Sequence, residues 1–203
     1  MINSQQLTLD RAARLRDAVC SAYSAAAESP TTKHAFPVGR VLAERLGYPA
    51  DLLETLPPVS VEAFAGVSNV SVFAVIPPGA VVLDLGCGAG VDSLIAVRRT
   101  GASGRVIGID FSDSMLARAR QAAAELDAAI AFLRGDAERL PLDDDSVDVA
   151  LVNGIFNLNP ARTEIFRELA RVVRPGGSAY AAELILQEPV PKTAEFDAAA
   201  WFA

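Results

Sequence analysis

The chain of 203 residues has little of what most hydrolytic and metal sites require: two cysteines and one histidine. Two thiols, Cys20 and Cys87, are too few for a disulfide framework or a four-ligand zinc site, so we expect no metal site. His34 lies in a stretch without a nucleophile motif, which disfavours Ser-His-Asp and Cys-His chemistry. The scarcity of these residues directs attention to chemistry that needs neither.

Positive charge and long apolar runs are also scarce. The 18 Lys and Arg against 25 Asp and Glu give a net charge of −7, and affinity for nucleic acid depends on Lys and Arg neutralising phosphates. We therefore expect no nucleic-acid partner. The sequence contains no apolar run of about 18 residues for a membrane span, and residues 1–10 lack the basic-then-apolar order of a signal peptide. The expected location is the cytoplasm, with no membrane partner.

The apolar residues that are present, 51% of the chain, are arranged in two patterns. Residues 1–75 predict a helical N-terminal cap, with an amphipathic helix over 7–27 and short helices at 41–46, 51–56 and 59–64. Residues 76–187 alternate strands with helices, which indicates an α/β core with a parallel sheet. The expected strands are 81–85, 105–110, 129–134, 147–153 and 179–186, and the expected helices are 91–99, 112–126 and 160–173. Residues 174–177 read as a turn before the last strand.

A glycine loop follows the first strand of this core, in the order Asp84-Leu85-Gly86-Cys87-Gly88-Ala89-Gly90. Glycines let the backbone approach a ligand, and the helix that follows offers free N–H groups. The dinucleotide fingerprint would require glycine or alanine at position 91, where the chain has Val91. The pattern G-x-G-x-G after an acid instead resembles the first motif of class I S-adenosylmethionine-dependent methyltransferases. A purely structural tight turn is the alternative interpretation.

Further features of the same βα units support this resemblance. Asp110 ends the second strand, where its carboxylate can accept hydrogen bonds from both hydroxyls of a ribose, and Phe111 and Met115 can flank an adenine. Asp136 and Ala137 follow the third strand, where they can bind the adenine edge. The resemblance implies a Rossmann-like sheet of order 3-2-1-4-5, S-adenosylmethionine as cofactor and S-adenosylhomocysteine as product. The cofactor-binding residues that it implies are Asp84, Gly86, Cys87, Gly88, Gly90, Asp110, Phe111, Met115, Asp136, Ala137 and Asn153.

The substrate class is addressed by the segment after the fourth strand, Asn153-Gly154-Ile155-Phe156-Asn157-Leu158-Asn159-Pro160. It lacks the Asn/Asp-Pro-Pro-aromatic motif of enzymes that methylate nucleic-acid amines. Residues 140–148 and 168–177 resemble small-molecule methyltransferases, and residues 39–201 resemble the arsenite methyltransferase branch.

That branch holds trivalent arsenic with cysteine thiolates, and this chain lacks its cysteines. Gly154 stands where one is expected, residues 32–39 contain none, and a last one is expected just beyond Trp201. We therefore expect a small organic acceptor rather than arsenite. Phe156 and Asn157, with Asn153, are the candidates to line its site, unless they brace the loop. No catalytic base is identified.

The end of the chain is short for the family that it resembles, which usually adds two more strands. Residues 188–203 form an incomplete C-terminal segment with too little length for them, so the strand at 179–186 would be an exposed edge. We expect either a truncated form or a homodimer through this edge. A cofactor-binding module or truncated methyltransferase with little activity remains an alternative function, and a nucleotide-dependent oxidoreductase is a third.

Overall fold

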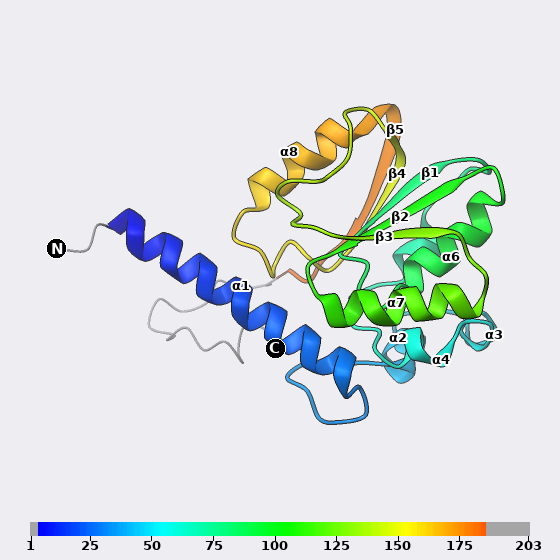
Figure 1. The fold of residues 1–203 in the computed structure, drawn as a ribbon, viewed down its shortest axis with the longest axis horizontal. Helices are drawn as coiled ribbons and strands as arrows, with labels where there is room; N and C mark the ends of the chain where they lie inside the picture. Colours follow the sequence, from blue (N-terminus) through cyan, green and yellow to red (C-terminus); the bar gives the residue numbers. More distant parts are fainter. Residues whose placement is uncertain (1–3, 186–203) are drawn as a thin grey trace.

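The core of the protein is a five-stranded sheet in the order β3-β2-β1-β4-β5, in which all neighbouring strands are parallel (Figure 1). The computed structural model describes residues 4–185, with side chains from residue 13 onward. The strands are β1 (Val81–Leu85), β2 (Arg105–Asp110), β3 (Ile130–Arg134), β4 (Val147–Asn153) and β5 (Val173–Ala182). The observed order confirms the fold class and the order 3-2-1-4-5 expected from the sequence.

Helices cover both faces of the sheet, which explains the continuous apolar runs of the central strands. In β1, Val82 packs on the face covered by α6 (Val91–Thr100), whereas Leu83 and Leu85 pack on the opposite face. That opposite face is covered by α8 (Arg162–Val172), which buries Ile165 and Leu169 at the i, i+4 spacing of one helical stripe. The helix α7 (Asp113–Glu125) packs beside α6, and the hydroxyl of its N-cap residue, Ser112, accepts a hydrogen bond from the backbone N–H of Met115. A serine at this position satisfies a backbone N–H of the first turn that has no partner within the helix.

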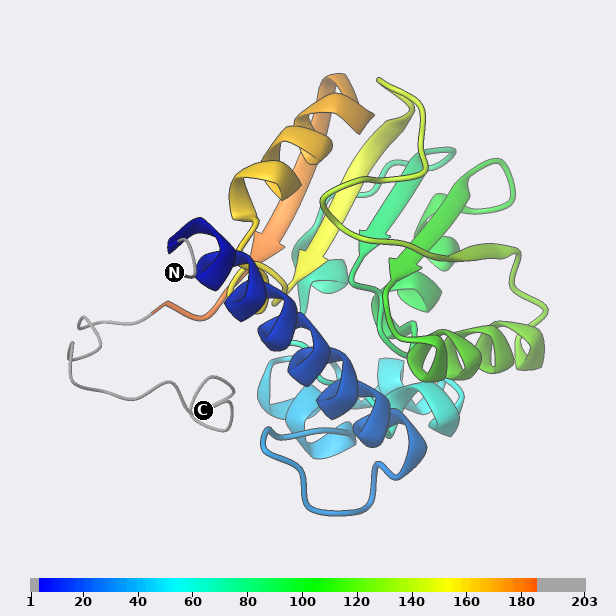
Figure 2. The ribbon, with the colours of Figure 1, turned by 60° about the vertical axis from the view of Figure 1, so that its left-hand side comes forward.

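Five helices precede the sheet: α1 (Ser4–Glu28), α2 (Arg40–Arg45), α3 (Ala50–Glu54), α4 (Pro58–Val61) and α5 (Val70–Phe73). Residues of α2, α3 and α4 share an apolar cluster with α6 and α7. The long helix α1 crosses the carboxyl ends of the strands (Figure 2). Helix α1 begins three residues before the start at residue 7 that was expected from the sequence. Helix α5 was not expected, because four residues are too few to show a helical period. Within residues 4–185, no helix is both long and apolar enough to cross a bilayer.

The last strand differs from the prediction of a turn at 174–177 followed by a strand at 179–186. Val147 of β4 pairs with Val173, but Val149 pairs with Ser178, so four residues of β5 lie opposite one residue of β4. Gly176 has a φ of 81° in this irregularity, which glycine adopts without strain. The turn residues are thus a bulge within one strand, and the strand ends at Ala182 rather than 186. The incomplete C-terminal segment expected at 188–203 lies outside the described residues.

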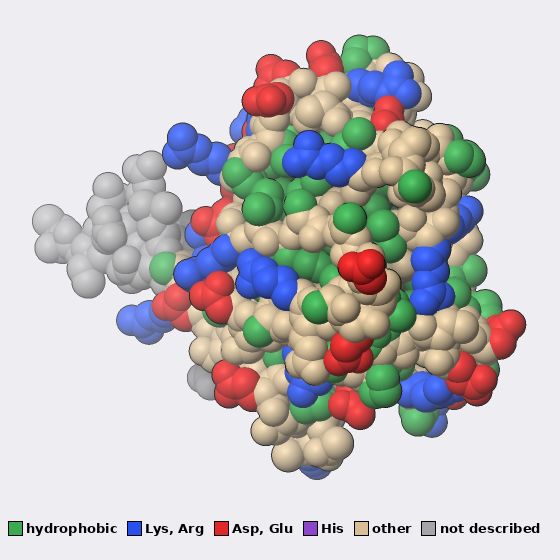
Figure 3. All heavy atoms as spheres, turned by 45° about the vertical axis from the view of Figure 1, so that its right-hand side comes forward, with side chains coloured by type: hydrophobic (Ala, Val, Ile, Leu, Met, Phe, Trp, Pro, Cys, Tyr) green, Lys and Arg blue, Asp and Glu red, His purple; other side chains and the backbone are tan. Residues whose placement is uncertain are grey.

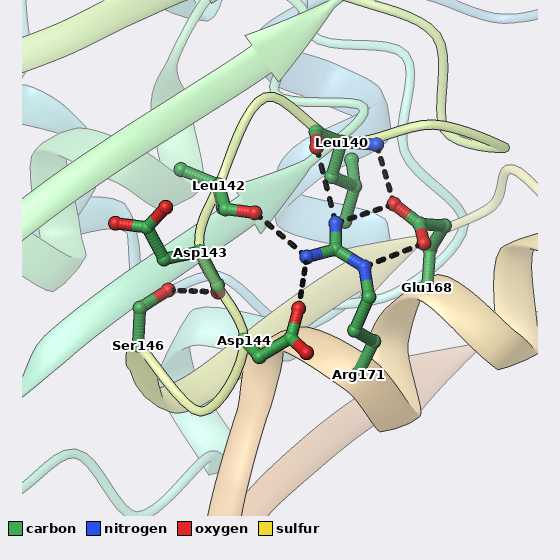
Figure 4. Close-up of polar contacts among 7 residues, drawn as sticks. All are labelled: Leu140, Leu142, Asp143, Asp144, Ser146, Glu168 and Arg171. Carbon is green, nitrogen blue, oxygen red and sulfur yellow. Dashed lines mark hydrogen bonds and ion pairs between the residues drawn. The ribbon is translucent and has the colours of Figure 1, made fainter.

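The connection between β3 and β4 contains no helix, and Arg171 of α8 holds it in place (Figure 4). Its guanidinium donates to the carbonyls of Leu140 and Leu142, at 3.1 and 2.8 Å, and to the carboxylate of Asp144 at 2.8 Å. It also makes two 2.7 Å bonds to Glu168, whose Oε2 accepts the N–H of Leu140 at 2.7 Å. Because the bidentate pair fixes the guanidinium, one side chain anchors the whole connection on α8.

Candidate functional site

Two adjoining clefts open at the carboxyl ends of the strands, the position where open parallel sheets bind ligands. The central cleft has about 610 Å³ of empty space and the flanking cleft about 590 Å³, with the open solvent at their mouths included. Both are lined by Gly86, Asp110, Phe111, Ile155 and Leu158, so they form one continuous depression divided by these residues. Helix α1 forms part of both walls and reduces their exposure to solvent.

The glycines of the loop at 84–90 have different tasks. Gly86 and Gly88 line the central cleft with φ of 75° and 50°, and a side chain at Gly86 would overlap Ile155. Gly90 lines neither cleft. It starts α6 with a φ of 87°, and a Cβ there would lie 3.1 Å from the Cβ of Ala119 in α7. The first two glycines therefore open the floor of the cleft, while the third lets two helices approach.

Asp110 is the acidic group at the centre of the depression. It is buried at the end of β2; its Oδ2 accepts the N–H of Gly88 at 2.9 Å and its Oδ1 accepts the N–H of Ser112 at 2.8 Å. Burial raises the pKa of this carboxyl, and these backbone donors oppose the rise. Each oxygen still has a lone pair for a further donor, so the carboxylate is held in one orientation and can accept hydroxyls.

The other residues proposed from the second and third strands also line the clefts. Phe111 lines both, Met115 lines the central cleft, and Asp136 and Ala137 line the flanking cleft. Met115 is fully buried at the start of α7, which is positioned by the Ser112 cap. The structure thus brings together at one edge of the sheet residues that are far apart in the sequence.

Asp84 and Cys87, by contrast, are held within the protein. Asp84 lies behind the loop and lines neither cleft; it accepts the hydroxyl of Ser93 at 2.5 Å, and burial, followed by the charge of Asp92, raises its pKa to about 8. Cys87 lines the central cleft, but burial, reinforced by the charge of Asp110, raises the pKa of its thiol. A protonated thiol is a poor metal ligand and a poor nucleophile.

Asn153 lines the central cleft, but its amide is already bonded to the protein. Its oxygen accepts the N–H groups of Val67 and Ser68 at 2.9 and 3.0 Å. Its nitrogen donates to the carbonyl of Ser68 at 2.7 Å and to Oδ2 of Asp92 at 2.9 Å. With both donors and both acceptor sites occupied, this side chain braces the segment before α5.

The two candidates for the acceptor site lie outside the clefts. Phe156 points into the apolar cluster under α8, where it stacks on Phe166 with ring centroids 4.6 Å apart. Asn157 donates its backbone N–H to Glu183 at 3.1 Å and is among the residues that line neither cleft. Their neighbours Ile155 and Leu158 face the cleft instead.

Tyr23 and Asp92 are two of the cleft residues that were not expected from the sequence. Tyr23 of α1 lies in the wall of the central cleft. The sequence could not show this, because the periodicity of α1 indicates an apolar face but not which part of the protein that face packs against. Asp92 is buried in the first turn of α6, where it accepts the hydroxyl of Tyr48 at 2.6 Å. An acid directly after the glycine loop was the available signal for it.

The described residues contain no group of three or more His, Cys, Asp or Glu side chains that could hold a metal ion. At Gly154, where the resemblance places a cysteine, φ is 82° and the methyl groups of Val67 lie 2.9 and 3.1 Å from where a Cβ would be. The space that a thiol side chain would enter is therefore filled.

Comparison with known proteins supplies the family. Residues 76–201 match the family model described as a methyltransferase domain. An arsenite methyltransferase of Halobacterium salinarum is 37% identical over 155 residues, which cover 76% of this chain and 39% of that protein. A 2-phytyl-1,4-naphthoquinone methyltransferase of Synechococcus elongatus is 41% identical over 117 residues, covering 55% and 48% of the two chains.

A solved structure gives the same result. The arsenic(III) S-adenosylmethionine methyltransferase of Chlamydomonas reinhardtii matches with a TM-score of 0.59 and 26% identity, over 76% of this chain and 52% of that one. The chain thus spans about half the length, or less, of these relatives. The parallel sheet, the glycine loop with Asp110, and the match over residues 76–201 lead to one conclusion: the chain belongs to the methyltransferase domain family of class I S-adenosylmethionine-dependent methyltransferases.

Proposed function

We propose that the protein transfers a methyl group from S-adenosylmethionine to a small organic acceptor. The observation that carries this proposal is the joint position of the open glycine floor and the fixed carboxylate of Asp110 in one depression. The chain spans only part of its relatives, so this site and not their activity supports the proposal.

The residues present fit the cofactor. The floor at Gly86 and Gly88 has no side chain to exclude a bound group, and the free lone pairs of Asp110 suit a pair of ribose hydroxyls. Phe111 and Met115 offer apolar surface for a base, and Asp136 lines the flanking cleft. When bound, S-adenosylmethionine supplies an already activated methyl group, so the protein chiefly has to orient the acceptor and exclude water.

Arsenite is disfavoured as the acceptor by the chemistry of the central cleft. Among the described residues, Cys87 is the cysteine that lines it, and burial keeps this thiol protonated. The position of Gly154 is closed by Val67. Without thiolates the cleft has no soft ligands for a trivalent metalloid. An organic acceptor with its own nucleophilic atom fits this wall better.

A methyl-transfer assay tests the proposal. Formation of S-adenosylhomocysteine is measured with thiol, phenol and arsenite acceptors, for the wild type and for Gly88→Val, which places a branched side chain on the floor. We expect turnover with an organic acceptor, little or none with arsenite, and loss of activity in the variant. Preference for arsenite would contradict the acceptor class. Cofactor binding without turnover on any acceptor would favour a binding module with little activity.

We also propose that the chain pairs with a second copy through the free edge of β5. We further propose that it acts in the cytoplasm and binds no nucleic acid. β5 pairs with β4 on one side, and no strand within residues 4–185 pairs with its other side. On the face in Figure 3, Lys and Arg side chains are interspersed with acidic ones rather than gathered in one patch. Light scattering that gives the mass of one chain would contradict the dimer.

A further inference from the structure

Three buried carboxylates lie in or beside the glycine loop at 84–90. Asp84 ends the loop's first strand, Asp92 follows the loop in the first turn of α6, and Asp110 ends β2. Among residues 13–185, whose side chains the structure describes, no Lys, Arg or His forms an ion pair with any of these carboxylates. Charges buried in a protein are normally paired with an opposite charge. The positive charge that would balance this cluster is thus not supplied by the described residues.

Asp92 is surrounded by neutral donors. Its Oδ1 accepts the hydroxyl of Tyr48 at 2.6 Å, the N–H of Ser71 at 3.2 Å and the Ser71 hydroxyl, and its Oδ2 accepts the amide of Asn153 at 2.9 Å. An ionised carboxylate only accepts hydrogen bonds, so these donors suit the charged form and use its lone pairs. Burial, followed by the charge of Asp92, raises the pKa of Asp84 to about 8. The charge of Asp92 therefore acts on groups that its carboxylate does not touch.

The side of the cofactor that faces Asp92 follows from the lining of the clefts. Asp136 lines the flanking cleft, Asp110 lines both clefts, and Asp92 lines the central cleft. The proposed function places the ribose at Asp110 and the edge of the base at Asp136. Because the sulfonium is attached to the other side of the ribose, it enters the central cleft, where Asp92 lies. No Lys, Arg or His is among the described residues that line this cleft.

A comparison of cofactor with product isolates the effect of this charge. S-adenosylmethionine and S-adenosylhomocysteine carry the same ammonium and carboxylate groups, so the interactions of these groups are common to both ligands. The two ligands differ in one methyl group and in the positive charge of the sulfonium. Near a buried carboxylate, and without a cation to oppose it, that positive charge is attracted more strongly than it would be in water.

We propose that Asp92 is a specificity-determining residue, whose charge makes the cleft bind the cationic S-adenosylmethionine more tightly than S-adenosylhomocysteine, which lacks the sulfonium charge. Asp92 acts through its charge, since its lone pairs are used within the protein. This inference rests on the proposed methyltransferase function, and it holds for any methyl acceptor because it concerns the cofactor alone. A cleft with this preference releases its product in exchange for fresh cofactor.

Calorimetric titration without an acceptor tests the inference, because it measures affinity and needs no turnover. The ligands are S-adenosylmethionine, S-adenosylhomocysteine and sinefungin, which carries an ammonium group in place of the sulfonium. The wild type should bind both cationic ligands at least about 5-fold more tightly than S-adenosylhomocysteine. Asp92→Asn should lower both affinity ratios at least about 3-fold. The matched control is Tyr48→Phe, which removes one donor to the same carboxylate but keeps its charge, and it should leave the ratios unchanged.

The affinity ratio is the deciding quantity, because damage to the local structure weakens all three ligands alike. Loss of the charge of Asp92 weakens the two cationic ligands selectively. If the circular dichroism spectrum shows that Asp92→Asn does not fold, Asp92→Ser takes its place, since its smaller side chain leaves room for water among the same donors.

The contrary results are distinct from one another. Equal or tighter binding of S-adenosylhomocysteine by the wild type, or unchanged ratios in the Asp92 variant, would each overturn the inference. An advantage of S-adenosylmethionine that sinefungin does not share would show that the methyl group and not the charge is recognised, which also overturns it. Equal loss of the ratios in Tyr48→Phe would assign the effect to the hydrogen-bond network instead of the charge. Failure of the wild type to bind any of the three ligands would instead contradict the proposed function.

Discussion

Replacement of Asn153 by alanine should destabilise the protein more than is usual for a polar residue at the edge of a cleft. The change removes the bonds to Val67 N–H, Ser68 N–H, Ser68 C=O and Asp92. A net value of about 0.5–1.5 kcal/mol for each bond gives about 2–6 kcal/mol for the four. Since Val67 and Ser68 are partly exposed, water can satisfy some of the freed groups, and we expect a loss of about 2–4 kcal/mol.

Urea unfolding followed by circular dichroism measures this loss as a shift of the midpoint at constant slope. The matched control is Asn69→Ala, which removes one hydrogen bond of a side-chain amide, the 2.9 Å contact to the carbonyl of Gly47. This variant should lower the free energy of unfolding by about 1 kcal/mol or less. If Asn153→Ala unfolds within about 1 kcal/mol of the wild type, the amide does not brace this segment. The reasoning that its capacity is fully used would then be refuted.

Three further predictions use the same kinds of measurement. Arg171→Met should lower the free energy of unfolding by about 2–4 kcal/mol because it releases the β3–β4 connection. The control Arg167→Met removes an exposed ion pair of 3.3 Å and should lower it by less than about 0.5 kcal/mol. Equal losses in the two variants would contradict the anchoring role of Arg171. Asp84 has a higher pKa in the folded state than its ordinary value of 3.8, so the folded state holds its proton longer and stability should fall as pH rises from 3.8 towards about 8. Asp84→Asn should show a smaller fall in urea midpoint over this interval, and an unchanged fall would argue against the shift. Gly86→Ala should weaken S-adenosylhomocysteine binding at least about 10-fold, because the added methyl group overlaps Ile155 at the floor of the cleft. The control Gly176→Ala has a similar φ of 81° with open space around it, so it should lower stability without changing this affinity. Retained affinity in Gly86→Ala would contradict the overlap.

The sheet could be predicted because its strands carry their own signal. The apolar runs of β1, β2 and β4 reflect burial on both faces, and the loop residues Gly86 and Gly88 mark where the first strand meets its helix. The cap at Ser112 is equally local, since the residue and its partner are three positions apart. Features of this kind depend on a few neighbouring residues, which the sequence displays directly.

The orientation of side chains in the irregular segments could not be predicted. After β4 there is no period of two or of 3.6 to assign a face, and Ile155 faces the cleft whereas Phe156 faces the core. The partners of Asn153 lie more than 60 positions away, so no local pattern distinguishes a brace from a ligand group. The position of Tyr23 likewise depends on how α1 packs across the strands.

The claim that this depression holds S-adenosylmethionine at the carboxylate of Asp110 is tested most directly by isothermal titration calorimetry with S-adenosylhomocysteine. The wild type should bind with one-to-one stoichiometry, and Asp110→Ala, with Asp110→Asn as the variant closest in shape, should lose measurable binding while keeping the circular dichroism spectrum of the wild type. NADH should give no heat of binding. Binding of NADH without S-adenosylhomocysteine, or equal affinity for S-adenosylhomocysteine in the wild type and both variants, would contradict the account.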